Sequence, residues 1–171
     1  ATVTKRMYEY AGYFAINVSS PNTPGLRKLQ DKEYIVQLIE AVNQAMDECS
    51  ERKPLFVKIA PDLTYDAIDE LLEVAVTHNI TGIIASNTTI NSDLKGKYGA
   101  RWKNSPGGLS GDDEDYRKMT TDIISHIYRN AGDKLDIIGV GGINNAETAL
   151  EKIKAGAKVL QLVTAIRGEG T

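Results

Sequence analysis

Amides, hydroxyls and prolines gather in one stretch of the chain, Asn17-Val18-Ser19-Ser20-Pro21-Asn22-Thr23-Pro24-Gly25-Leu26-Arg27. Its two prolines prevent a helix, and the run before it, residues 13–18, is typical of a strand. A loop rich in hydrogen-bonding side chains at the end of a buried strand suits a polar ligand. The same residue types also form ordinary turns, so the composition of this stretch leaves both interpretations open.

Further short apolar runs predict strands over residues 55–60, 82–86, 136–140 and 158–163. Residues 1–11 are expected to form the last part of a helix, with Gly12 as its stop signal. Apolar residues at helical spacing predict four main helices. The residues that define their buried faces are Ile35, Leu38, Ile39, Val42 and Met46; Ile68, Leu71, Leu72, Ala75 and Val76; Met119, Ile123, Ile124 and Ile127; and Ala149, Leu150 and Ile153.

Capping residues mark where three of these helices begin. Asp31 and Thr64 are expected N-caps of the first two, and Asn144 with Glu147 has the spacing of a capping box for the fourth. Residues 87–113 form a long polar segment, which in a compact domain is usually functional or disordered. Within it, residues 95–105 are expected to form a lid over the site, with disorder as the alternative.

The alternation of strands and helices predicts βαβ units and a parallel sheet. Every polar cluster follows a strand and none follows a helix, which favours a (β/α)8 TIM barrel, whose sites lie at the C-terminal ends of the strands. A doubly wound open sheet is the second possibility. Because only five strands and four main helices are predicted, we expect residues 1–171 to be a single, incomplete barrel domain with two unpaired strand edges.

Lys58 is unusual in its predicted strand. By the two-residue period, Phe56, Lys58 and Ala60 share the face opposite to that of Leu55 and its alternate neighbours. A lysine that points into an apolar barrel needs a partner, since a buried unpaired charge is costly. The alternative is an edge-strand lysine in solvent.

The composition is that of a globular protein, with 42% hydrophobic and 25% charged residues. The net charge of −3 provides no global attraction for nucleic acid. Cys49 is the single cysteine, so no internal disulfide is possible. No apolar run approaches the ~20 residues of a membrane span, and neither a signal-peptide pattern nor an initiator Met is present.

The polar stretch resembles the active-site loop of class 2 dihydroorotate dehydrogenases, flavin enzymes of pyrimidine synthesis. Four later stretches resemble the same family in the same order: Val57-Lys58-Ile59-Ala60-Pro61-Asp62-Leu63, Ser86-Asn87-Thr88-Thr89, Gly107-Gly108-Leu109-Ser110-Gly111 and Ile138-Gly139-Val140-Gly141-Gly142-Ile143. The resemblance covers nearly the whole chain and corresponds to the later part of the family's barrel. It implies that the front of the barrel, the membrane-associating helices and the final helix lie outside this chain.

The resemblance also implies a reaction and the residues that carry it. Dihydroorotate would lose a proton to Ser20 and a hydride to FMN, and a quinone would reoxidise the flavin. The expected substrate contacts are Asn17, Asn22, Asn87 and Thr88. The expected FMN contacts are Asn17, Lys58, Ser86, Gly111, Gly141, Gly142, Val163 and Thr164, and no metal is expected. Membrane association would place the protein at a mitochondrial inner membrane or a bacterial cytoplasmic membrane.

The residue types fit these implied roles, although each has a structural alternative. Carboxamides donate and accept at once, which suits orotate, and glycines let backbone amides approach a phosphate at a helix N-terminus. A glycine pair is also a common turn, and the Ser20 hydroxyl could simply cap Asn22. His78 and His126 lie in or beside helices and are expected at the surface, so they offer no obvious partner for Ser20.

Two positions depart from the family pattern. Val163 stands where the family usually has Tyr, and four acids, Asp112-Asp113-Glu114-Asp115, follow Gly111 in place of a basic-Pro-Leu sequence. Two other interpretations of the chain remain open. It could belong to another FMN-dependent barrel oxidoreductase, class 1-like or dihydropyrimidine-type, although Ser20 rather than Cys argues against this. It could also be a non-catalytic barrel fragment.

Overall fold

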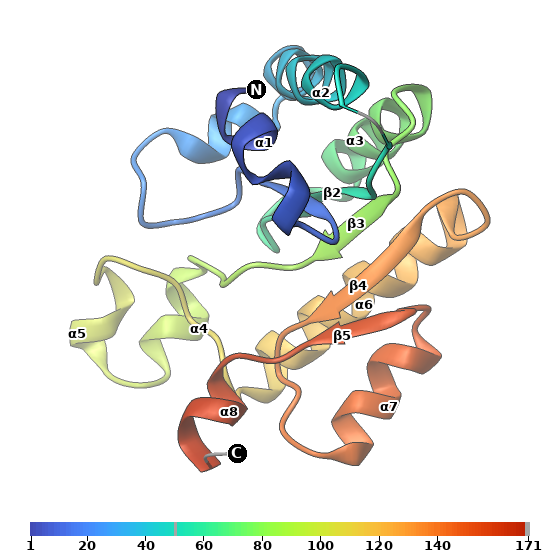
Figure 1. Cartoon of the computed structure of the whole chain (residues 1–171). Coiled ribbons are helices and arrows are strands. Elements are labelled where there is room, and N and C mark those ends of the chain that lie inside the picture. Colours follow the sequence, from blue (N-terminus) through green and yellow to red (C-terminus); the bar gives the residue numbers. More distant parts are fainter. Residues whose placement is uncertain (50, 170–171) are drawn as a thin grey trace.

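A computed structural model describes residues 1–49 and 51–169 of the chain (Figure 1). At its centre lies a single five-stranded sheet. All neighbouring strands are parallel, and they lie side by side in the order of the sequence. The strands are β1 (Phe14–Asn17), β2 (Leu55–Ile59), β3 (Gly82–Ala85), β4 (Asp136–Val140) and β5 (Val159–Gln161).

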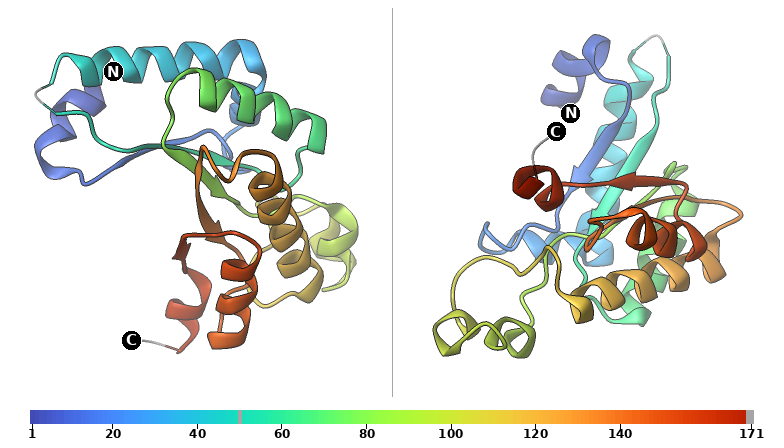
Figure 2. Two further views of the ribbon diagram at one scale, coloured as in Figure 1. Left: turned by 90° about the vertical axis from the view of Figure 1, so that its right-hand side faces the viewer. Right: turned by 90° about the horizontal axis from the view of Figure 1, so that it is seen from below.

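Four long helices form the crossovers between successive strands: α2 (Lys32–Asp47), α3 (Tyr65–Thr77), α6 (Glu114–Ala131) and α7 (Ala146–Lys154). They form an arc around the outside of the sheet (Figure 2). The shorter elements are α1 (Thr2–Met7), the 3-10 turns Tyr8–Tyr10 and Leu26–Gln30, α4 (Ser92–Gly96), α5 (Ala100–Lys103) and α8 (Thr164–Glu169). Over the residues described, no helix has both the length and the apolar character to cross a membrane.

The topology is that of a barrel wall rather than of a doubly wound sheet. A doubly wound sheet reverses its strand order at one point and has helices on both faces, whereas this sheet runs from β1 to β5 without reversal. A flat sheet would separate β1 and β5 by about 19 Å, four strand spacings. Yet Gln161 of β5 donates to the Tyr13 hydroxyl, just ahead of β1, over 3.4 Å. The sheet therefore curves, and the predicted incomplete barrel is confirmed.

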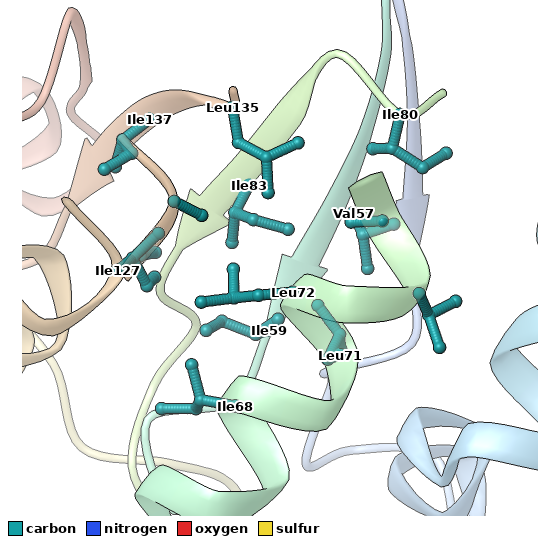
Figure 3. Close-up of a cluster of buried hydrophobic side chains, with 14 of the residues drawn as sticks. Val57, Ile59, Ile68, Leu71, Leu72, Ile80, Ile83, Ile127, Leu135 and Ile137 are labelled. Atoms are coloured by element: carbon teal, nitrogen blue, oxygen red, sulfur yellow. The ribbon is translucent and has the colours of Figure 1, made fainter. Parts of the chain in front are cut away.

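The main core fills the space between the convex face of the sheet and the helices (Figure 3). Val57, Ile59 and Ile83 point from β2 and β3 toward the helices, where Ile68 of α3 and Ile127 of α6 meet them. All five side chains are at most 1% exposed. Because alternate residues of a strand point to opposite faces, the concave face is lined by the remaining positions, and a separate small cluster there consists of Phe56, Ile84, Ile138 and Val140.

Most predicted elements are present, but several boundaries are corrected. The helix cap at α7 lies one residue later than predicted, because Asn145 accepts from the Thr148 amide and Thr148 replaces Glu147 as the reciprocal partner. Thr64 caps α3 as predicted, whereas Asp31 stands at the N-cap of α2 without a side-chain cap bond.

Three apolar residues assigned to buried helix faces are exposed. Val76 is exposed on α3, and Val74 is buried in its place. Leu150 and Ile153 are exposed on α7, and the helix packs instead through Thr148 and Lys152. The predicted last strand ends at Gln161, and Thr164–Glu169 form α8, which the sequence did not predict.

The polar segment 87–113 is ordered, so the alternative of disorder is wrong. It contains α4 and α5 and returns to the sheet through an antiparallel bridge between Thr89 and Leu109. Lys95 is 7% exposed, and its ammonium donates to the carbonyls of Ser105 and Gly107, which closes the excursion. The segment lies beyond the C-terminal end of β3, to one side of the sheet (Figure 1).

Candidate active site

A cavity of about 390 Å³ lies where the loops after β3, β4 and β5 converge, beside Lys58 near the end of β2. This is the end of the sheet at which barrel enzymes place their sites. Nine of the twelve predicted site residues line it: Lys58, Ser86, Asn87, Thr88, Gly111, Gly141, Gly142, Val163 and Thr164. The other three, Asn17, Ser20 and Asn22, belong to β1 and the loop that follows it.

Lys58 lies on the concave face of β2, so the predicted alternation is confirmed. It pairs with Asn17 on one side and Ile84 on the other, and β2 is therefore not an edge strand. The side chain is half-buried, and this burial lowers the pKa of its ammonium. Among the described residues, none accepts a hydrogen bond from the ammonium, which borders the cavity as an unpaired cation. An anionic group in the cavity would meet this charge directly.

Gly141 and Gly142 form the turn between β4 and α7 with positive φ angles of 106° and 68°. A Cβ at Gly141 would lie 2.9 Å from the Tyr116 hydroxyl, and a Cβ at Gly142 would lie 2.6 Å from Arg117 Cβ. The turn is therefore limited to glycine by both conformation and space. It leads into the N-terminus of α7, a helix end that favours an anion.

Gly111 and Thr164 meet on the far side of the cavity. Gly111 has a φ of +94°, and a Cβ there would lie 3.3 Å from Thr164 Cγ2. Thr164 begins α8, and the neighbouring Val163 is exposed at the cavity rim.

Ser19 joins the first loop to the third. It is fully buried, donates to Asn17 Oδ1 over 2.9 Å and accepts from Asn87 Nδ2 over 3.1 Å. The Asn87 side chain also accepts from the Thr88 amide over 2.8 Å. Asn17, Asn87 and Thr88 are therefore held in one network, whose central hydroxyl belongs to the serine that the sequence analysis passed over in favour of Ser20.

Ser20 and Asn22 lie in the same loop but do not line the cavity. The Ser20 hydroxyl accepts from the Asn22 amide over 3.2 Å, which is the turn that was left open as an alternative. Asn22 is exposed, and its Oδ1 would lie 3.4 Å from a Cβ at Gly107. The loop after β1 is thus adjacent to the end of the ordered segment 87–113.

Tyr116 is a lining residue that the sequence analysis missed. It is 1% exposed on α6, and its hydroxyl donates to the Asn87 carbonyl over 3.0 Å. Burial, and to a lesser extent the charge of Asp62, raises the pKa of this phenol to about 12, so the group is a donor over the whole physiological range. Its position within a polar helix gave no signal of this role.

The acidic run after Gly111 has structural partners. Asp113 is buried, caps α6 by accepting from the Tyr116 amide over 2.7 Å, and accepts from the Tyr98 hydroxyl over 2.8 Å. Asp115 pairs with Lys97. These acids therefore fix the start of α6 against the segment that contains α4 and α5.

Neither histidine touches the site. His126 of α6 bonds Asp69 of α3 over 2.6 Å and stacks on Tyr65. His78 bonds the Val74 carbonyl at the end of α3. Both side chains are partly exposed and lie away from the cavity, so neither partners Ser20. Within the described ranges, no three His, Cys, Asp or Glu side chains gather as a metal ion would require.

The whole chain, residues 1–171, matches the family model of dihydroorotate dehydrogenase. A relative named dihydroorotate dehydrogenase (quinone) from Rhizobium johnstonii is 45% identical over 170 residues, which cover 97% of this chain and 46% of the relative. The corresponding protein of Brucella ovis is 44% identical over 173 residues, with 97% and 46% covered. The chain spans about half the length of the relatives it matches.

Solved structures give the same result. The crystal structure of DHODH from Eimeria tenella in complex with ferulenol has a TM-score of 0.89 and 32% identity, over 99% of this chain and 49% of that one. The ligand-free type from the same organism has a TM-score of 0.86 and 32% identity, with 98% and 50% covered. Because the family model extends over the entire sequence and the relatives agree with it, this chain belongs to the dihydroorotate dehydrogenase family.

Proposed function

We propose that this chain provides the later half of the catalytic barrel of a quinone-dependent dihydroorotate dehydrogenase. The reaction is the oxidation of dihydroorotate to orotate in pyrimidine biosynthesis. The observation that carries the proposal is the gathering of an unpaired lysine, a hydrogen-bonded asparagine and positive-φ glycines around one cavity at the C-terminal ends of the strands. The 171 residues would form part of a single FMN-binding domain.

The lining of the cavity suits FMN. The unpaired Lys58 ammonium would face the flavin ring and stabilise negative charge on it. The turn at Gly141 and Gly142, with Thr164 opposite, would receive the phosphate through backbone amides and a hydroxyl. Asn17, Ser86, Gly111 and the backbone of Val163 complete the proposed contacts. When bound, FMN supplies the hydride acceptor and passes the electrons on to a quinone.

The substrate would lie between the loops after β1 and β3. Dihydroorotate presents a carboxylate and amide edges that both donate and accept, and the carboxamides of Asn17, Asn22 and Asn87 match both functions. The Thr88 hydroxyl adds a further donor. Because Ser19 holds Asn17 and Asn87 in fixed orientation, these two amides are positioned before substrate arrives.

Ser20 is the proposed base that removes the proton from C5 as the hydride leaves C6. A serine hydroxyl is a weak base, and its oxygen already accepts one hydrogen bond from the Asn22 amide. A donor to the oxygen favours the deprotonated form, as any hydrogen bond to a charged form does. A water or threonine hydroxyl would carry the proton away from Ser20.

The proposed electron acceptor places the enzyme at a membrane. Quinones of respiratory chains dissolve in the bilayer, so the protein that carries this chain would associate with a mitochondrial inner membrane or a bacterial cytoplasmic membrane. Segments of the longer protein outside these 171 residues would make that contact. The proposed reaction requires no nucleic acid.

Anaerobic addition of dihydroorotate to the flavin-loaded, full-length protein tests the proposal. The visible flavin band is expected to bleach. Ser20→Ala is expected to retain flavin and to bleach far more slowly, whereas Ser92→Ala, at an exposed serine outside the cavity, is expected to behave as the unmodified protein. Retained flavin without bleaching in the unmodified protein would reject dihydroorotate as substrate, and a protein that retains no flavin would reject the cofactor.

A further inference from the structure

Arg27 lies in the 3-10 helix Leu26–Gln30, just after the loop that follows β1, and its guanidinium donates to three different loops. Its Nε donates to the Ser19 carbonyl over 3.1 Å. Its Nη1 donates to Asp62 Oδ2 over 2.6 Å, and its Nη2 donates to the Thr88 carbonyl over 2.8 Å. These acceptors lie after β1, β2 and β3 respectively. One side chain thus connects three of the loops at the candidate site.

Asp62 extends the same connection from its own loop. Besides Arg27, it accepts from the Thr89 hydroxyl through Oδ1 and from the Ile90 amide over 3.1 Å through Oδ2. The side chains of Arg27 and Asp62 are 19% and 20% exposed, so this ion pair is largely shielded from solvent. Shielded bonds between ionised partners are about twice as strong as neutral ones.

The position of Arg27 is itself fixed by the end of β2. Gln30, 6% exposed, donates to the Arg27 carbonyl over 3.2 Å and accepts from the Ala60 amide over 2.9 Å. The 3-10 helix Leu26–Gln30 is therefore anchored to the sheet. Because the guanidinium extends from this anchored helix, its contacts fix the Ser19 carbonyl, next to the proposed base Ser20, relative to Thr88.

We propose that Arg27 and Asp62 are positioning residues. They hold the loop that contains Ser20 and Asn22 close enough to Asn87 and Thr88 for both loops to contact the same substrate. This inference rests on the proposed function, because it assigns proton removal to Ser20. The planar guanidinium makes three directed bonds at once, which a lysine ammonium on a flexible stem does not reproduce. A misplacement of about 1 Å costs as much as 100-fold in rate.

The main test compares Arg27→Lys with Arg129→Lys, a matched change at an exposed arginine of α6. In anaerobic reduction of the flavin-loaded full-length protein, Arg27→Lys is expected to lower the bleaching rate at saturating dihydroorotate by roughly 10- to 100-fold. Its flavin content is expected to stay unchanged, since Arg27 does not line the cavity. Arg129→Lys is expected to change neither quantity. An unchanged bleaching rate in Arg27→Lys would overturn the proposal.

Two further measurements separate positioning from general stability. Millimolar guanidinium is expected to restore part of the rate in Arg27→Ala but none in Ser20→Ala, an effect that a merely stabilising residue would not show. In an Arg27→Ala and Asp62→Asn cycle, the double variant is expected to lose no more rate than the more impaired single variant. Independent, multiplying losses would contradict a joint role.

Hydrogen exchange decides the positioning claim even if dihydroorotate is not the substrate. Arg27→Lys is expected to raise the exchange of amides in residues 17–27 and 86–90 and to leave the core strand β4 unchanged. If the unmodified protein fails to bleach but this pattern appears, the proposed function is wrong and the positioning role stands. If exchange is unaltered in both loops, the positioning role is wrong whatever the substrate.

Discussion

Gly142→Ala tests the geometry of the turn between β4 and α7. Gly142 has a φ of +68°, a conformation that side chains disfavour. An added Cβ would lie 2.6 Å from Arg117 Cβ, 2.8 Å from its Cγ and 3.0 Å from its Cα. Since the Cα belongs to the backbone of α6, rotation of the Arg117 side chain does not relieve the contact. Either the turn or the helix has to move.

The expected cost has two parts. A left-handed alanine costs roughly 1 kcal/mol relative to glycine. The overpacking adds about 1–3 kcal/mol, so the free energy of unfolding should fall by about 2–4 kcal/mol. Gly25→Ala is a matched control, because Gly25 has a φ of +75° and nothing lies within 4 Å of its added Cβ. That control should lose only the first part, roughly 1 kcal/mol.

Urea denaturation of the flavin-free full-length protein measures both variants, and gel filtration followed by absorbance measures retained flavin. Gly142→Ala is expected to be the less stable variant and to lose flavin, because the displaced turn is the proposed phosphate site. Gly25→Ala is expected to retain flavin. Equal destabilisation by the two substitutions would refute the argument from close approach, and full flavin retention in Gly142→Ala would remove the turn from the proposed cofactor site.

Two other predictions concern buried lysines. Lys152 is fully buried, and burial lowers the pKa of its ammonium to about 8. Between about pH 8 and 10.5 the unfolded state therefore binds more protons than the folded state. The free energy of unfolding is expected to rise with pH over this range by up to about 3 kcal/mol. Lys152→Met should lack this rise when both proteins are denatured at about pH 7.5 and about pH 10, and an identical pH dependence would contradict it. Lys58→Met should raise the melting temperature of the flavin-free protein, because an unpaired half-buried cation is removed, and should weaken flavin retention; a lower melting temperature with unchanged retention would oppose both expectations.

The sequence predicted the strands of the sheet because buried parallel strands appear as short, nearly continuous apolar runs. Residues 55–60 were expected as a strand, and β2 covers Leu55–Ile59 with Lys58 on the concave face. The two-residue period determines which side chains share a face of the strand. The apolar residues in the run then indicate which face is buried. The placement of polar clusters after strands was sufficient to locate the candidate site at one end of the barrel.

The sequence did not predict features that depend on tertiary hydrogen bonds. Two adjacent asparagines could each cap α7, and only the backbone decides that Asn145 does so with Thr148. The polar segment 87–113 has no apolar period, yet the buried Lys95 holds its ends together through two carbonyls. Such bonds leave no trace in periodicity, because donor and acceptor are a lysine and the backbone of distant residues.

Residue types alone do not distinguish the roles of the adjacent serines Ser19 and Ser20. Neighbouring positions in an extended chain point in opposite directions, so Ser19 and Ser20 face different surroundings, and residue type alone does not tell the two apart. Ser19 is buried, and its hydroxyl is already occupied as donor to Asn17 and acceptor from Asn87. A base must have an oxygen available to the substrate, and breaking the Ser19 bonds would release both amides. Ser20 therefore remains the proposed base, because its oxygen accepts only the Asn22 amide among the described residues.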